Sequence, residues 1–161
     1  MLNIFLQEFK EKYNSPISDF FYGVIEIRSK CLGCNIIKYN FQVFSFLEFP
    51  LQQVNQYYYY MGRRQLFCND GTNPDIDLYE CFEYNRKIDL MNGENQMFCN
   101  NCNKLLDATY TTLIYSSPIY LIINLNRGKG AIYECKVIFP EQLNIINFVT
   151  YQQGITVYEL I

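Results

Sequence analysis

Two short cysteine pairs are the residues of this sequence whose type and spacing could perform chemistry. Cys31 and Cys34 lie in "KCLGC", and Cys99 and Cys102 lie in "FCNNC". A Cys-x-x-Cys turn lets two thiolates converge on one ion, and two such turns supply the tetrahedral sulfur set that zinc favours. The sequence therefore predicts one structural Zn²⁺ with four ligands, Cys31, Cys34, Cys99 and Cys102.

The spacing of the pairs indicates what such a site does. Because 64 residues lie between Cys34 and Cys99, the metal would join two turns that are remote in sequence. A closed four-sulfur shell leaves no position for water, so we expect no hydrolysis at this site. Metal binding by four cysteines also needs no histidine ligand, and the chain has no histidine. A redox role for either pair is the alternative. Zinc is favoured because neither pair opens a helix after a strand, as a thioredoxin-like pair does.

The other three cysteines are interpreted as structural. Cys68 lies beside the polar "NDG" turn and could be an exposed nucleophile, but a thiol protease needs an imidazole to accept the proton, and the sequence has no histidine. Cys81 and Cys135 lie in apolar patterns that bury thiols as small hydrophobic side chains. We therefore predict no catalytic residue in this chain.

Composition and charge exclude several classes of protein. The chain has 161 residues, of which 50% are hydrophobic, enough for one buried core. A net charge of −3 gives no basic stripe, which argues against a nucleic-acid partner. Acidic Glu8 and Glu11 and the lack of a long apolar run argue against a leader or a membrane partner. With seven cysteines, an odd number, we expect a reducing compartment, the cytoplasm or the nucleus.

The N-terminal half is expected to contain two strands and two helices. An amphipathic helix is predicted for residues 2–12, ended by Pro16, and a helix is predicted for residues 75–84 after a turn at residues 69–71. Strands are predicted for residues 20–27 and 36–49, joined as a hairpin with Cys31 and Cys34 at its tip. The Gln- and Asn-rich context of Tyr57–Tyr60 favours a surface loop, and no site is assigned to it.

The C-terminal half is expected to be mostly strands. Residues 105–115 alternate polar and apolar side chains and should return from the second cysteine turn. The apolar run "PIYLIINLNR", residues 118–127, predicts a central strand buried on both faces. A Gly-Lys-Gly turn and strands at residues 131–139 and 155–161 should follow. The whole is interpreted as a β-rich chain with one or two helices.

The order of these blocks resembles the ubiquitin-specific protease family of deubiquitinases. Gly23, Phe46, Cys99 and Arg127 occupy positions that match the motifs of this family. The resemblance covers residues 20–161 and rests on these stretches: "FFYGVIEIRSKCLGC", "FSFLEFPL", "LYECFEYNRK", "GENQMFCNNC", "SSPIYLIINLNRGKG" and "VIFPEQLNI".

The resemblance implies an α+β fold in which residues 1–161 form part of a papain-like ubiquitin-specific protease domain. Its fingers would comprise about residues 20–49 and 88–116, and its palm strands about residues 117–161. In this family the fingers hold ubiquitin, and a Cys-His-Asp/Asn triad cuts the isopeptide bond at the ubiquitin C-terminus. The implied partner is ubiquitin or a ubiquitinated protein.

The sequence departs from the family pattern at the catalytic residues. No nucleophile motif precedes Cys31, and no histidine motif is present, while "VYELI" at residues 157–161 resembles the strand that leads to that histidine motif. We therefore expect a fragment of a deubiquitinase, truncated at both ends and inactive alone. The alternative is a non-catalytic ubiquitin-binding or scaffold protein. A zinc-ribbon module that binds nucleic acid is disfavoured by the acidic charge and the long spacing.

Overall fold

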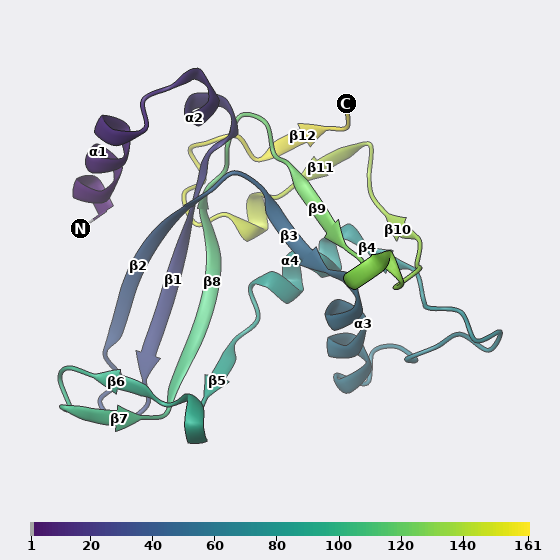
Figure 1. Ribbon diagram of the computed structural model, residues 1–161, viewed down its shortest axis with the longest axis horizontal. Coiled ribbons are helices and arrows are strands. Elements are labelled where there is room, and N and C mark those ends of the chain that lie inside the picture. The colour runs from purple at the N-terminus through teal and green to yellow at the C-terminus, as the bar shows by residue number, and fades with distance from the viewer. Residues whose placement is uncertain (1) are drawn as a thin grey trace.

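A long antiparallel sheet and a separate packed core make up the fold, which a computed structural model describes for residues 2–161 (Figure 1). The long sheet has four strands, and the described residues form four further sheets of two strands each. With four α-helices, the α+β class is confirmed, and the expectation of one or two helices is wrong. No helix in the described part of the chain is long and apolar enough to cross a bilayer.

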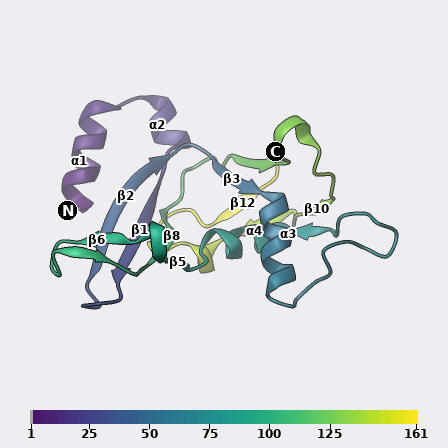
Figure 2. The same cartoon turned by 60° about the horizontal axis from the view of Figure 1, so that its bottom comes forward.

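The long sheet confirms the predicted hairpin, but the strand expected at residues 36–49 ends at Phe44, and a separate strand begins at Leu47. Strand β1 (Gly23–Cys31) pairs antiparallel with β2 (Ile37–Phe44) on one side and with β8 (Ala108–Ser116) on the other. The short strand β5 (Asp89–Met91) pairs with the outer edge of β8. A second hairpin, formed by β6 (Met97–Cys99) and β7 (Lys104–Leu106), lies across the far end of the sheet (Figures 1 and 2).

The hydrophobic core lies at the other end of the molecule, where short elements surround two helices. Its sheets pair β3 with β9 and β4 with β10 in parallel, and β11 with β12 antiparallel. The elements are β3 (Leu47–Pro50), α3 (Leu51–Tyr60), β4 (Ile76–Asp77), α4 (Leu78–Asn85), β9 (Ile123–Asn126), β10 (Val137–Ile138), β11 (Gln142–Asn144) and β12 (Val157–Glu159). Short 3-10 helices occupy Gly93–Asn95, Lys129–Ala131 and Ile146–Phe148.

The N-terminal helix is confirmed as α1 (Leu2–Lys12), but strand β1 begins later than expected. Pro16 opens a second helix, α2 (Pro16–Phe21), whose first turn is capped by Ser15 and Ser18. Proline suits the first turn of a helix because its missing N–H has no partner there anyway. Residues 20–21 are therefore helical, and β1 starts at Gly23.

The tyrosine-rich stretch is a helix, so the predicted surface loop is wrong. In α3 the buried side chains are Leu51, Val54, Asn55 and Tyr58, a spacing of three and four residues along one helix face. The polar glutamines nearby indicated a loop, but contact with the core stabilises the helix. A buried apolar face stabilises a helix more than local propensity does.

Two predicted strands are much shorter than expected. Within residues 2–161, strand β9 pairs only with β3, and Ile119, Tyr120 and Ile122 are exposed, so this run is neither central nor buried on both faces. Only Leu121, Ile123 and Leu125 pack against the core, which is the alternation of a strand with one covered face. The strand expected at residues 131–139 is reduced to β10, while the last strand is confirmed as β12.

The predicted helix at residues 75–84 is confirmed as α4, and its start is fixed by a capping box. Tyr79 N–H donates to Asp77 Oδ1 over 2.7 Å, and Asp77 N–H donates to Glu80 Oε2 over 3.0 Å. We expect Asp77→Ala to lower the free energy of unfolding by about 1 kcal/mol, because the first turn loses its acceptor. Urea denaturation measures this change. Asp75→Ala, at an exposed position outside the box, is the control, and an equal loss there would contradict the capping role.

Candidate metal centre

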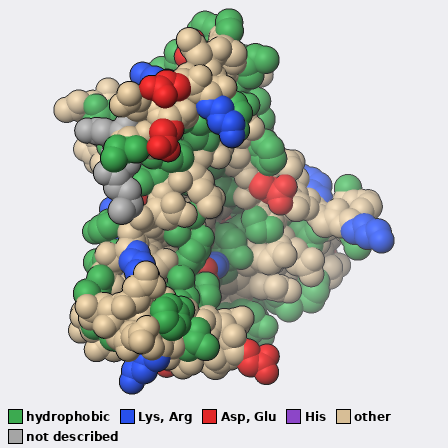
Figure 3. Space-filling model, turned by 60° about the vertical axis from the view of Figure 1, so that its left-hand side comes forward, with side chains coloured by type: hydrophobic (Ala, Val, Ile, Leu, Met, Phe, Trp, Pro, Cys, Tyr) green, Lys and Arg blue, Asp and Glu red, His purple; other side chains and the backbone are tan. Residues whose placement is uncertain are grey.

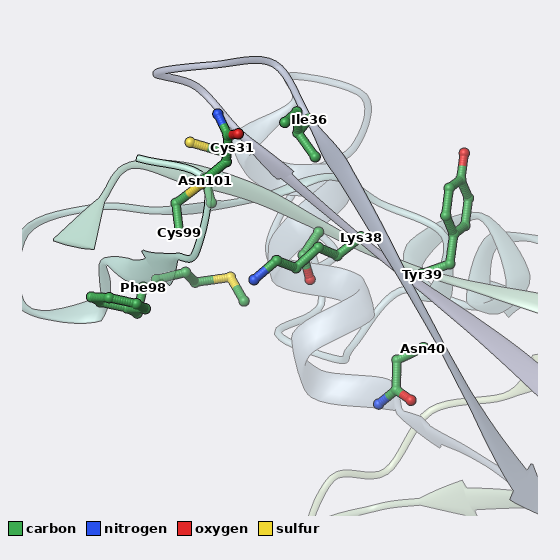
Figure 4. A pocket seen from close by; sticks show the side chains of 11 residues that line it. Cys31, Ile36, Lys38, Tyr39, Asn40, Phe98, Cys99 and Asn101 are labelled. Carbon is green, nitrogen blue, oxygen red and sulfur yellow. The ribbon is translucent and has the colours of Figure 1, made fainter. Parts of the chain in front are cut away.

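The four paired cysteines meet at the end of the long sheet. Cys31 ends β1 and Cys99 ends β6, while Cys34 and Cys102 lie in the turns that follow these strands. All four Sγ atoms lie within 4.8 Å of one another, and the Sγ atoms of Cys34 and Cys99 are 3.6 Å apart. Figure 4 shows the side chains of Cys31 and Cys99 pointing toward the same place.

This arrangement fits a tetrahedral zinc ion. Four sulfurs placed 2.3 Å from a central Zn²⁺ would be about 3.8 Å from one another, close to the separations found here. The donor set is sulfur only, which suits zinc better than magnesium or calcium. Cys31 and Cys99 are buried, and Cys34 and Cys102 are partly covered, so the four sulfurs would enclose the ion and leave no place for a substrate.

Both cysteine turns have the same local conformation. The residue after each pair is an asparagine with a left-handed backbone, Asn35 with φ 60° and Asn103 with φ 52°. Asparagine tolerates this conformation better than other residues with a side chain. In the first turn the carbonyl of Cys31 accepts from Asn35 N–H over 2.8 Å, and Cys31 N–H donates to the Ile36 carbonyl over 3.0 Å. These bonds close the turn and direct both thiols inward.

The two turns are also joined by hydrogen bonds and packing that the sequence analysis missed. Leu32 N–H donates to the Asp107 carbonyl over 2.9 Å, and the Asp107 carboxylate accepts from Gln96 Nε2 over 2.7 Å. At Gly33 a Cβ atom would lie 2.6 Å from Leu106 Cδ1, so the glycine allows the turns to approach closely. The repeated asparagine after each cysteine pair was a signal available in the sequence, whereas nothing marked Asp107 or Gln96.

The electrostatics of the cluster favour binding of a cation. The backbone N–H of Cys102 lowers the pKa of the Cys99 thiol to about 6. The hydrogen bond with Cys34 raises the pKa of the Cys102 thiol to about 12. Four neighbouring thiols cannot all ionise without a positive charge among them, and a bound Zn²⁺ would supply it.

The other thiols lie away from this cluster. Cys81 is fully buried, and burial raises the pKa of its thiol to about 12. Burial also raises the pKa of Cys135, which is partly covered, while Cys68 is exposed. The structural interpretation of Cys81 therefore agrees with its surroundings. Cys68 is an accessible thiol, but the sequence has no histidine whose imidazole could take its proton.

The remaining motif positions have structural surroundings. Gly23 opens β1, where a Cβ atom would lie 2.8 Å from the Ser116 carbonyl oxygen. Phe46 is half-exposed between β2 and β3. Arg127 Nη1 donates to the Cys135 carbonyl over 2.9 Å and to the Tyr133 carbonyl over 3.2 Å, which fixes the loop after β9.

Fold and cluster together define an α+β protein whose long sheet ends in a cluster of four cysteines that could hold a metal ion. A family model described as "Ubiquitin carboxyl-terminal hydrolase" matches residues 1–161. The chain therefore belongs to the ubiquitin carboxyl-terminal hydrolase family, and the expected resemblance is confirmed.

Individual relatives agree with this assignment. Ubiquitin carboxyl-terminal hydrolase 21 of Homo sapiens is 25% identical over 164 residues, which cover 98% of this chain and 26% of the relative. Ubiquitin carboxyl-terminal hydrolase 4 of Saccharomyces cerevisiae (strain YJM789) is 25% identical over 136 residues, covering 83% of this chain and 13% of the relative. The chain thus spans about a quarter or less of the length of these relatives.

A solved structure has a similar fold. The SAGA DUB module bound to ubiquitin aldehyde contains a chain that superposes with a TM-score of 0.64 at 20% sequence identity. The match covers 94% of this chain and 32% of that chain. At this identity the likeness concerns the fold alone.

Proposed function

We propose that this chain is the ubiquitin-holding part of a deubiquitinase of the ubiquitin-specific type, stabilised by one structural Zn²⁺. The convergence of four cysteine sulfurs at the end of the long sheet, in a chain of this family, carries the proposal. The ligands would be Cys31, Cys34, Cys99 and Cys102, and the ion would fix the position of the turns without taking part in bond cleavage.

In this proposal the fingers comprise about residues 20–49 and 88–116, which include the long sheet and the cysteine turns, and residues 117–161 contribute to the palm. The separation of the sheet from the core supports this division, since most buried core residues lie in elements outside the sheet. A space-filling view shows a hollow in the middle of one face, with hydrophobic side chains around it (Figure 3). A concave face of this kind suits a globular partner such as ubiquitin.

Ubiquitin binding by the zinc-loaded chain is the first test. Titration of ¹⁵N-labelled ubiquitin is expected to shift a contiguous set of its amide signals, because ordered fingers present a fixed surface. Cys99→Ser should weaken these shifts strongly, and Cys68→Ser, at an exposed thiol outside the cluster, should leave them unchanged. The absence of any shift with the zinc-loaded chain would rule out a ubiquitin-holding role.

The chain alone is expected to bind without cleaving. Thiol proteolysis needs a base to take the proton from the nucleophile, and this sequence has no histidine. We therefore expect no release of fluorophore from a ubiquitin C-terminal reporter above the buffer rate. Turnover above background that persists without zinc would contradict this expectation. In a complete enzyme the nucleophile and the base would come from other sequence.

A non-catalytic ubiquitin-binding or scaffold protein is the second candidate. The mass of the endogenous protein distinguishes the two. A mass well above 19.2 kDa, with additional peptides that contain a histidine and a further cysteine, supports the enzyme. A mass of 19.2 kDa supports the scaffold.

A further inference from the structure

The outer edge of β2 has backbone groups free to pair with another strand. In the sheet order β2-β1-β8-β5, the described residues give β2 a neighbour on one side only. Cys31 N–H donates to the Ile36 carbonyl, so Cys31 and Ile36 form a hydrogen-bonded pair. Two residues further along, Ser29 lies opposite Lys38 and forms the next pair of this kind. Since hydrogen-bonded and non-bonded pairs alternate in an antiparallel ladder, the N–H and C=O groups of Ile37, Tyr39 and Phe41 point away from β1.

Part of this edge is blocked, and part of it is open. Phe41 N–H donates to the side-chain oxygen Oδ1 of Asn40 over 3.0 Å, and the Phe41 ring contacts Phe5 of α1 at a centroid distance of 6.3 Å. In the described part of the chain no hydrogen bond and no contact with α1 covers the outward backbone groups of Ile37 and Tyr39, which are 41% and 47% exposed. The Tyr39 ring contacts Arg28 of β1, whose guanidinium carbon lies 5.9 Å from the ring centroid. The open segment of the edge is therefore centred on Lys38.

A cavity lies directly beside this open segment. Its volume is about 270 Å³, and strand β2, strand β6 and the turn that follows β6 supply most of its walls. Ile36, Met97 and Phe98 give it apolar walls, and Lys38 extends into the space between β2 and β6 (Figure 4). Sites for small molecules typically have about 300–1,000 Å³, so this cavity suits a side chain better than a whole ligand.

Lys38 gives the cavity a charge preference. The four ion pairs found among the described residues are Arg28–Glu26, Arg64–Glu80, Arg86–Glu83 and Lys87–Asp89, so the ammonium of Lys38 has no carboxylate partner there. An ammonium group beside apolar walls is complemented by a carboxylate on an incoming chain.

The geometry points to β2 as a docking edge for an extended peptide that carries an acidic residue. The peptide would add a strand to the sheet through the backbone groups of Ile37 and Tyr39, which is β-augmentation. Because alternate residues of a strand share a face, an acidic side chain would meet Lys38 while an apolar one, two residues away, enters the cavity. This inference does not depend on ubiquitin binding.

A second copy of the chain fits the edge less well. A two-fold antiparallel pairing centred on the open segment would place Ile37 opposite Tyr39 and Lys38 opposite its own copy. Like charges directly opposite each other in a sheet are destabilising, and edge lysines are a common protection against self-pairing. The charge therefore favours an acidic peptide over self-association.

A proline variant tests the backbone contact. We expect selection of displayed random 12-residue peptides on the zinc-loaded chain to yield sequences with a β-branched residue and an Asp or Glu. Synthetic copies should bind Tyr39→Val like the wild type but bind Tyr39→Pro at least tenfold more weakly by fluorescence anisotropy. Both variants remove the phenol ring, but only proline removes the outward N–H, and an edge strand tolerates it.

Two further measurements keep the test decisive. Lys38→Glu should weaken binding of the selected peptides at least fivefold and strengthen binding of versions in which Lys replaces the acidic residue. Amide exchange of Ile37 and Tyr39 in the wild type should slow when peptide is bound, which does not depend on the folding of any variant. The inference would be overturned if no peptide were selected, or if the proline and valine variants bound the selected peptides equally. It would also be overturned if the amides of Ile37 and Tyr39 stayed unprotected with peptide present, or if the chain formed concentration-dependent dimers in place of binding peptide.

Discussion

Replacing Cys99 with serine is expected to reduce the zinc content from one ion per chain to none and to disorder the end of the long sheet. Cys99 is one of the four clustered cysteines, with its sulfur 3.6 Å from that of Cys34. Structural zinc contributes about 10–16 kcal/mol of apparent binding free energy in zinc-finger peptides, so one lost ligand removes much of what holds the two turns together. Chelation of the wild-type protein should have the same effect.

Metal analysis and hydrogen exchange measure this result separately. Zinc per chain should fall to zero, and amide protection should be lost in β6, β7 and the turn after β1. Protection in α4 should persist, because Phe82 and Cys81 are buried in a core that contains none of the four cysteines. Cys68→Ser is the matched control, since it removes an exposed thiol. Full zinc content in Cys99→Ser with an unchanged melting curve would contradict the four-cysteine site.

Phe82→Ala is expected to lower the free energy of unfolding by about 3–5 kcal/mol, the usual cost of removing a large buried aromatic side chain. The Phe82 ring is buried in α4, with its centroid 5.0 Å from that of Phe49 and 5.2 Å from that of Phe148. The truncation leaves a cavity where a strand, an α-helix and a 3-10 helix meet. A loss of this size is a large fraction of the stability of a typical domain.

Urea denaturation with the zinc site loaded gives the size of the effect. The control is Phe67→Ala, the same substitution at a residue that is 55% exposed, where we expect a change within about 0.5 kcal/mol. Zinc content should stay at one per chain in both variants, since neither residue lies in the cluster. Equal effects at the two positions would show that Phe82 is not part of a cooperative core.

The cysteine centre could be predicted from the sequence because its signal is local. Each Cys-x-x-Cys pair identifies a turn, and two such turns imply a shared ion even when they are remote in sequence. The hairpin around Cys31 was predicted for the same reason, since turn residues and strand residues lie next to each other in the chain. The contact between Asp107 and Leu32 had no such signal, because it depends on how the two turns meet.

Elements whose conformation depends on distant partners were predicted less well. In α3 the composition indicated a loop, although Leu51, Val54 and Tyr58 already had helical spacing, and contact with the core made that spacing decisive. The run that contains β9 was expected to be buried because it is apolar. Its partners decide its burial, and among the described residues β9 pairs with β3 alone. Sequence patterns report which residues prefer to be covered, but they do not report what covers them.

The distance in sequence between the two cysteine turns has a consequence for how the protein forms during its synthesis. At about 5–20 residues per second, the 64 residues between Cys34 and Cys99 take about 3–13 s to be made. During this interval the β1–β2 hairpin can form with only two thiols at its tip. A nascent chain therefore has only two of the four ligands at first. A metal ion bound there can be shared with other thiols until β6 and β7 form and supply the other two.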